Sequence, residues 1–261
     1  MSRYTDHEQA SNVLKEIERR PDKYLIIHYS CESFYNLNGK SPRIASISVR
    51  KYNDGQTINF SMHQYLEKRQ HSTTDESSQT IEKELLEDFF SYVSKNGDKF
   101  WIHWNMRDTV FGFHALEHRF KVLGGDPTVI DDDKKIDLAH LLKLYFGGGY
   151  ISNPHIEKLA LKNGLKPYRF LTGEKEAEAF NNQEYNELSM STSSKTNLFS
   201  TFVTMLIDGT LKTDIPKWKI RGVKLSGLLA TFQETTYGKL IFWILNLVIG
   251  GIIGAIIAKY V

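Results

Sequence analysis

The spacing of apolar positions changes along the chain, and each spacing predicts a different element. Apolar residues first recur at helical spacing, and Pro21 ends that helix. Short apolar runs then predict strands over 24–29, 44–52, 57–63 and 99–103, with Asn53-Asp54-Gly55 as a hairpin turn. Helical spacing marks 81–94, 108–123, 135–146, 154–163, 174–182 and 195–207. Early strands followed mainly by helices predict an α/β layer sandwich with a small mixed sheet.

The last part of the pattern is apolar on every side. Residues 240–258 carry no charge between Lys239 and Lys259, and at 1.5 Å per residue they reach roughly 28 Å, close to the ~30 Å hydrocarbon core of a bilayer. This predicts a transmembrane helix that acts as a tail anchor, with a buried core helix as the alternative. The N-terminus lacks the apolar core of a secretory signal, and basic residues outnumber acidic ones before the span. The positive-inside rule then predicts a single-pass protein of the inner (cytoplasmic) membrane, with its N-terminal domain in the cytoplasm.

The pattern divides the chain into four segments. They are an N-terminal helix (1–22), a cytoplasmic domain (23–208), a basic linker with an amphipathic stretch suited to the lipid bilayer (209–239) and the span (240–258). Within the span, Asn246, Gly250, Gly254 and Ala258 recur every four residues and so share one helix face. Small residues at this spacing allow close helix approach, which predicts a homo-oligomer assembled through this face. The alternative is that glycine is simply common in such helices.

Composition and charge exclude several classes of protein. A hydrophobic share of 41% and a charged share of 25% exclude collagen-like and largely disordered chains. With 33 basic and 31 acidic residues, the net charge is only +2, so the chain as a whole lacks the large positive charge typical of nucleic-acid-binding proteins. The single cysteine, Cys31, excludes a disulfide scaffold and a zinc-finger cluster. Because neighbouring strand residues point to opposite faces, Cys31 is expected to be a buried thiol that points away from Ser30 and Glu32.

Four motifs of the predicted domain carry its candidate chemistry. They are LIIHYSCES (25–33), IHWNMRD (102–108), a pair of Leu-rich helices (136–144 and 155–164) and GEKEAEAF (173–180). The residues at the positions that matter for the comparison below are Ser30 and Glu32 in the first, Asn105 and Asp108 in the second, Asp137 in the third and Glu176 in the fourth. Over about 24–180 these motifs resemble the DnaQ-like branch of the ribonuclease H fold, which holds the DEDD 3′–5′ exonucleases. Phrases such as HYSCESF also resemble a family of uncharacterised bacterial proteins.

The resemblance implies a ribonuclease H-like three-layer sandwich with Glu32, Asp108, Asp137 and Glu176 as the catalytic residues of an active enzyme. Of these, Glu32, Asp108 and Glu176 would hold Mg²⁺ or Mn²⁺, because two-metal hydrolysis needs several converging carboxylates. The chain departs from the family at Ser30, which replaces an aspartate and is a poor ligand for hard cations. No histidine lies five residues before Glu176. The domain is therefore expected to lack the family's nuclease chemistry and to need no cofactor.

We accordingly expect a degenerate exonuclease-like domain that senses or binds a partner, nucleic acid or protein. It would signal to the self-associating span in the manner of a phage-defence or toxic membrane effector. The alternatives are an active, membrane-tethered, metal-dependent 3′–5′ exonuclease and a non-enzymatic membrane scaffold. The candidate binding residues lie on or after two strands, where α/β sheets place ligands: His28, His103, Trp104, Asn105 and Arg107. Trp104 is placed to stack on a base, and its alternative role is as a core aromatic.

Overall fold

The structure is a computed structural model that describes residues 3–33, 40–69, 75–107, 111–220, 232–233 and 235–260. Side chains are described for these residues except 69, 75–77 and 250–260. The chain divides into two compact units. The smaller unit comprises Met1–Ser11, Leu142–Ile151 and Thr213–Val261, and the larger comprises Asn12–Leu141 and Ser152–Lys212.

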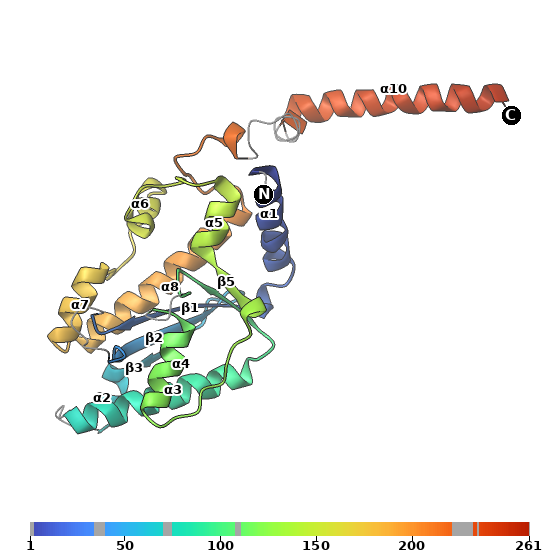
Figure 1. The fold of residues 1–261 in the computed structure, drawn as a ribbon. Helices are drawn as coiled ribbons and strands as arrows, with labels where there is room; N and C mark the ends of the chain where they lie inside the picture. Colours follow the sequence, from blue (N-terminus) through green and yellow to red (C-terminus); the bar gives the residue numbers. More distant parts are fainter. Residues whose placement is uncertain are drawn as a thin grey trace. The chain divides into compact units, whose positions relative to one another are not determined.

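The larger unit is built on a mixed five-stranded sheet (Figure 1). Its strands are β1 (Tyr24–Cys31), β2 (Ile44–Lys51), β3 (Thr57–Ser61), β4 (Phe100–His103) and β5 (Lys135–Asp137). They lie in the order β3-β2-β1-β4-β5; β2 runs antiparallel to its two neighbours, whereas β1, β4 and β5 are parallel to one another. Gly55 turns the β2–β3 hairpin at a φ of +74°, a conformation that favours glycine. The predicted α/β fold with a small mixed sheet is confirmed.

Nine named α-helices complete the part of the chain that the structure describes. They are α1 (Arg3–Arg19), α2 (Met62–Arg69), α3 (Asp75–Lys95), α4 (Phe113–Val122), α5 (Leu138–Phe146), α6 (His155–Lys162), α7 (Gly173–Asn181), α8 (Tyr185–Ile207) and α10 (Thr236–Tyr260).

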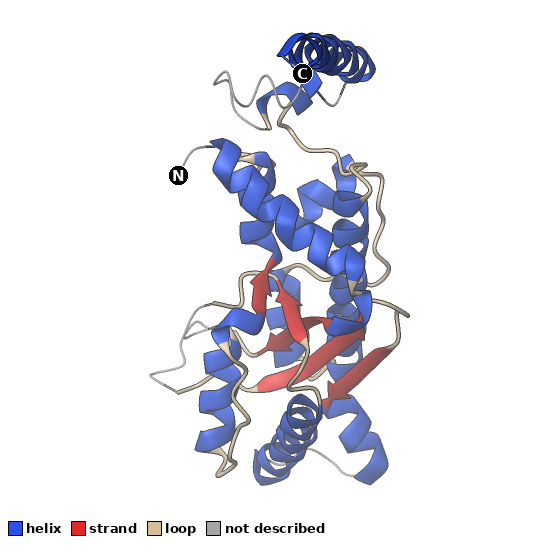
Figure 2. Ribbon diagram, turned by 90° about the vertical axis from the view of Figure 1, so that its right-hand side faces the viewer, coloured by secondary structure: helices blue, strands red, loops and turns tan. Residues whose placement is uncertain are grey.

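Helices cover both faces of the sheet (Figure 2), and alternate residues of β1 serve the two faces. Ile27 and Tyr29 join a buried apolar cluster with residues of α3 and α4. On the other face, the Ser30 hydroxyl accepts a hydrogen bond from Thr192 of α8 at 3.1 Å, and the His28 ring lies 5.5 Å from that of Phe199. Since both faces are covered, β1 is buried along its whole length, as its nearly continuous apolar run predicts.

Three boundaries differ from the sequence prediction. Residues 135–137 form strand β5 rather than the start of a helix, because a three-residue strand is too short to show a period and is decided by its pairing with β4. Helix α2 begins at Met62, where the pattern extends a strand to 63. Helix α8 begins at Tyr185, well before the predicted start at 195. Its first half buries hydroxyl side chains rather than an apolar stripe, so helical spacing of apolar residues is absent there.

The smaller unit is held partly by side chains of α1 that bond to the end of α5. Arg3 donates hydrogen bonds to the carbonyls of Leu144 and Tyr145, and its Nε donates to the carbonyl of Ile220 at 2.8 Å. The His7 Nδ1 donates to the Tyr145 carbonyl at 2.9 Å. The last carbonyls of a helix lack partners within it, so these two side chains satisfy the exposed end of α5.

Helix α10 covers the segment predicted to span a membrane. In the part of the chain that the structure describes, no helix combines the length and the apolar character that a membrane crossing requires. The finding contradicts the predicted transmembrane tail anchor at 240–258 and, with it, the predicted inner-membrane location.

The predicted helix-association face is described at one of its four positions. Asn246 is exposed, whereas Gly250, Gly254 and Ala258 lie outside the residues whose side chains are described. The predicted amphipathic stretch of the linker falls mainly in 221–231, which also lies outside the described residues. Self-association through α10 therefore stays a prediction.

Candidate functional site

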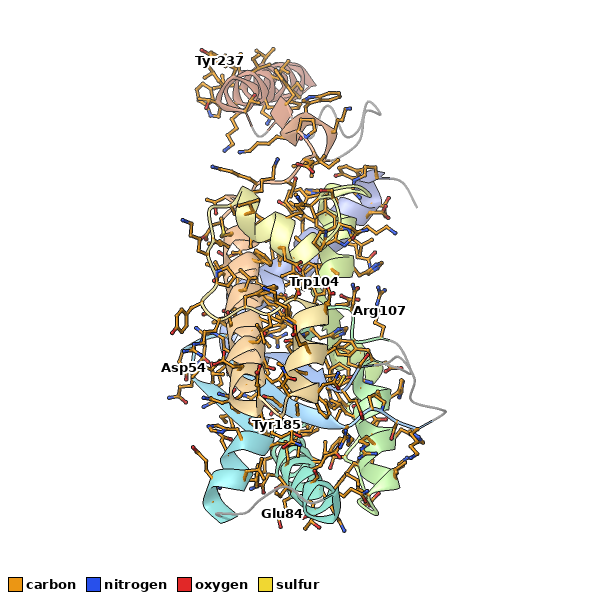
Figure 3. The ribbon with its side chains drawn as sticks, turned by 90° about the vertical axis from the view of Figure 1, so that its left-hand side faces the viewer. Asp54, Glu84, Trp104, Arg107, Tyr185 and Tyr237 are labelled. Atoms are coloured by element: carbon orange, nitrogen blue, oxygen red, sulfur yellow. The ribbon has the colours of Figure 1, made fainter. Side chains whose placement is uncertain are left out.

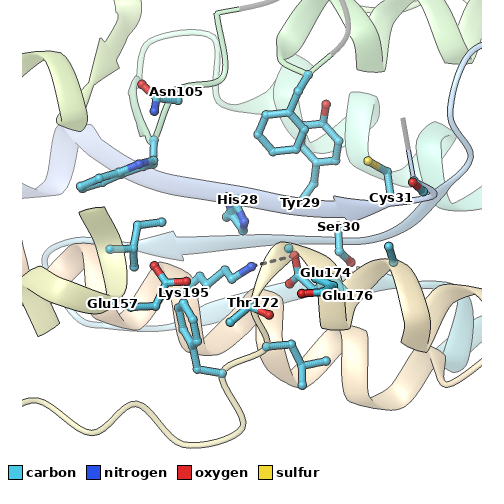
Figure 4. A pocket seen from close by; sticks show the side chains of 18 of the residues that line it. His28, Tyr29, Ser30, Cys31, Asn105, Glu157, Thr172, Glu174, Glu176 and Lys195 are labelled. Atoms are coloured by element: carbon cyan, nitrogen blue, oxygen red, sulfur yellow. Dashed lines mark ion pairs between the residues drawn. The ribbon is translucent and has the colours of Figure 1, made fainter. Parts of the chain in front are cut away.

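A cavity of about 770 Å³ lies beside the carboxyl end of β1 in the larger unit (Figure 4). Its wall is built from residues 28–33, the loop after β4, the first turn of α6, residues 170–172, the start of α7 and Lys195 of α8. The volume lies within the range of roughly 300–1,000 Å³ that is typical of small-molecule sites. Several elements that are distant in sequence thus contribute to one site.

The cavity wall contains a buried ion pair between α8 and α7. The Lys195 Nζ lies 2.7 Å from Oε2 of Glu176, and the two residues are only 5% and 9% exposed. The Ser191 hydroxyl, one turn before Lys195 on α8, donates to the other oxygen of Glu176 at 2.8 Å. The ring of Phe170 covers the ammonium, with its centroid 5.2 Å from Nζ. Buried charges are tolerated when they are paired and hydrogen-bonded in this way.

His28 lies on the face of β1 that points to the cavity. It is 6% exposed, and its Nδ1 finds no hydrogen-bond partner among the residues that the structure describes. Burial and, secondarily, the charge of Lys195 lower the pKa of His28 well below its usual value, so the imidazole is neutral. A neutral imidazole offers one donor and one acceptor, and the one at Nδ1 is buried without a partner among the described residues.

The other two described carboxylates of the DnaQ-like motifs are also held by cations of the chain. Glu32 binds Arg43 through both of its oxygens, at 3.0 and 3.1 Å. Burial would raise the pKa of Glu32, but the Arg43 guanidinium lowers it below its ordinary value. Asp137 lies 2.5 Å from the Nε of Arg107, and its Oδ1 accepts from the backbone N–H of Ala139, as an N-cap of α5.

The structure brings only part of the predicted catalytic set together, and the predicted metal ligands are Glu32, Asp108 and Glu176 of that set. Glu32 and Glu176 both line the cavity, whereas Asp137 does not. Asp108 lies outside the described residues. Among the residues that are described, no three His, Cys, Asp or Glu side chains are close enough together to hold a metal ion. A Mg²⁺ or Mn²⁺ site that includes Asp108 stays a prediction.

Three of the five predicted binding residues line the cavity, namely His28, Trp104 and Asn105. Trp104 is 5% exposed and stacks on Phe199 at a centroid distance of 5.4 Å, so most of its ring serves the core, which was the alternative role. Arg107 follows on the same loop but lies at the surface (Figure 3). His103 is buried outside the cavity wall.

Sequence reasoning did not identify Lys195, although the chain carries a signal for it. Lys195 is the single charged residue between Leu188 and Ile207. A lone charge within a buried apolar and hydroxyl-bearing helix requires a partner. Cys31 is buried as expected, and burial raises the pKa of its thiol, which therefore stays protonated.

In the comparisons with known proteins, no family model matches the chain and no curated protein matches it. The geometry of the cavity therefore carries the functional argument.

His103 predicts a pH dependence of stability. Burial lowers its pKa to about 4, and its Nδ1 accepts a hydrogen bond from the backbone N–H of Met106 at 3.1 Å. The unfolded chain binds the proton near pH 6.5, so the folded state should lose up to about 3 kcal/mol of stability from this group as the pH falls from 6.5 to 4. Urea unfolding at several pH values measures this slope.

A His103→Asn chain is the matched control, because the amide oxygen can still accept from Met106 but does not titrate. Its stability should fall less steeply with decreasing pH than that of the unsubstituted chain. The charged groups that act on His103, namely Asp137, Arg107 and Lys135, are present in both chains, so the difference reports His103. Equal slopes in the two chains would contradict the prediction.

Proposed function

We propose that the larger unit is a degenerate DnaQ-like domain that binds a ligand in the cavity beside β1 without hydrolysing it. The observation that carries the proposal is the Lys195 ammonium, which lies 2.7 Å from the Glu176 carboxylate in the cavity wall. In the family that the motifs resemble, a carboxylate at this motif would hold a metal ion. In this chain, one of its own cations already occupies that carboxylate.

The arrangement of the motifs supports the DnaQ-like part of the proposal. Ser30 lies at the end of the central strand β1 and Glu32 directly after it, and the second motif begins in β4, which pairs with β1 in parallel. Helix α7, which carries Glu176, packs against β1. Motifs far apart in the sequence therefore gather at the same end of the sheet, where α/β folds place ligands.

Charge pairing supports the absence of hydrolysis. Two-metal hydrolysis needs several free carboxylates to hold cations about 3.5–4 Å apart. Here Glu32 is engaged by Arg43 and Glu176 by Lys195, and the Ser30 hydroxyl accepts from Thr192. A divalent ion would have to displace two protein cations to bind both glutamates, and the serine would be a weak ligand.

The test is a nuclease assay on the full chain with 3′-labelled single-stranded DNA and RNA. We expect no shortening with Mg²⁺ or Mn²⁺, under conditions in which a DEDD exonuclease degrades both substrates. A cooperative urea transition would show that the chain is folded. Metal-dependent shortening that disappears in a Glu32→Gln chain would overturn the proposal and establish the active exonuclease.

A further inference from the structure

We propose that the cavity beside β1 selects a small organic cation with amine groups, such as a polyamine, over ligands that carry phosphate. The inference rests on the proposed function, because it names the ligand class of a cavity that binds without hydrolysis. It follows from the charge of the cavity wall, from an unpartnered nitrogen and from the rings beside it.

The cavity wall has a surplus of negative charge. Of its charged residues, Glu176 is neutralised by Lys195 within the wall, and Glu32 is neutralised by Arg43. Glu157 and Glu174 also line the cavity, and among the described residues neither has an ion-pair partner. Each lies in the first turn of a helix, whose N-terminus offsets about half an elementary charge. A net negative charge of about one remains to be balanced by a ligand.

The unpartnered nitrogen belongs to His28. This side chain is more than nine-tenths buried, lies in the cavity wall beside Lys195, and its Nδ1 bonds to no described residue (Figure 4). Leaving such a nitrogen unpaired in a buried site costs free energy. An amine N–H of a bound ligand would donate to it when the proton of the neutral ring lies on Nε2.

Aromatic rings in the same wall also suit a cation. Phe111 and Phe170 contribute to the lining, and Phe170 already covers the Lys195 ammonium. The negative face of an aromatic ring attracts an ammonium group, most strongly where water is excluded. A phosphate group would instead meet the charge of Glu157 and Glu174 without a metal ion to offset it.

Isothermal titration calorimetry on the full chain tests the inference, with spermidine as the cationic probe and thymidine monophosphate as the anionic one, both without metal. We expect saturable binding of spermidine that weakens as salt is raised, and no binding of the nucleotide at millimolar concentration. The key variant is Glu157→Gln/Glu174→Gln, whose affinity for spermidine should fall by roughly tenfold or more. Both substitutions keep the side-chain size.

The matched control is Glu178→Gln, which removes an exposed charge of α7 that does not line the cavity. It should bind spermidine as the unsubstituted chain does. Equal weakening in the control and in the double variant would mean general attraction to an acidic surface and would overturn the inference. Absence of spermidine binding, or binding of the nucleotide alone, would overturn it too. Neither result would touch the proposed absence of hydrolysis, which the nuclease assay decides separately.

Discussion

A Lys195→Met chain is expected to unfold with a free energy about 3–5 kcal/mol below that of the unsubstituted chain. Methionine replaces much of the buried aliphatic stem of the lysine, so the change in packing is small. It removes the ammonium that lies 2.7 Å from Glu176, whose carboxylate then stays buried with the Ser191 hydroxyl donating to it. A buried carboxylate without a cation is costly, because one hydrogen bond does not replace the hydration that it loses.

Urea unfolding at neutral pH measures this loss, and a Lys195→Met/Glu176→Gln chain is its control. The glutamine is neutral and can still accept from Ser191, so the double variant should regain most of the stability. A single variant as stable as the unsubstituted chain would show that Lys195 and Glu176 do not form a buried pair. It would thereby remove the observation on which the proposed function depends.

Most strands of the fold could be predicted because the local sequence pattern shows that they are buried. Strand β1 is buried on both faces and reads as an apolar run, and the turn at Gly55 carries its own signal. Strand β5 and the first half of α8 left no such pattern. The first depends on pairing with β4, and the second packs against the sheet through buried hydroxyls such as Ser191 and Thr192. Such contacts are tertiary, and they override local preference.

The site was predictable only in its outline. The motifs located Glu32 and Glu176 at one cavity, but their neutralisation by Arg43 and Lys195 arises from residues on other elements. A sequence shows which side chains can be charged, whereas the fold decides which charges meet. The continuous apolar run at 240–258 likewise predicted a helix, and α10 confirms it. The predicted membrane crossing of that helix was wrong, because no helix among the described residues meets the requirements for a span.

An Arg119→Met chain is expected to lose about 3–5 kcal/mol of unfolding free energy for a reason unrelated to the cavity. Arg119 of α4 holds Glu82 of α3 through two hydrogen bonds, from Nε at 2.8 Å and from a terminal nitrogen at 2.5 Å. The same carboxylate accepts the backbone N–H of Ile44 at 2.7 Å, so the pair ties two helices to the start of β2. Glu82 is 1% exposed, and removal of the guanidinium leaves its charge inside the protein.

Two further chains separate this ion pair from a general effect of losing a charge. Lys83→Met removes the neighbouring cation of α3, which is 40% exposed at its side chain and lies 3.9 Å from Glu87, and its urea transition should hardly move. Arg119→Met/Glu82→Gln should recover much of the lost stability, because the glutamine can still accept from Ile44 without carrying a charge. If Arg119→Met and Lys83→Met shift the transition equally, the Arg119–Glu82 pair does not anchor α3 and α4. If the double variant recovers nothing, the loss comes from packing of the arginine stem rather than from an uncompensated carboxylate.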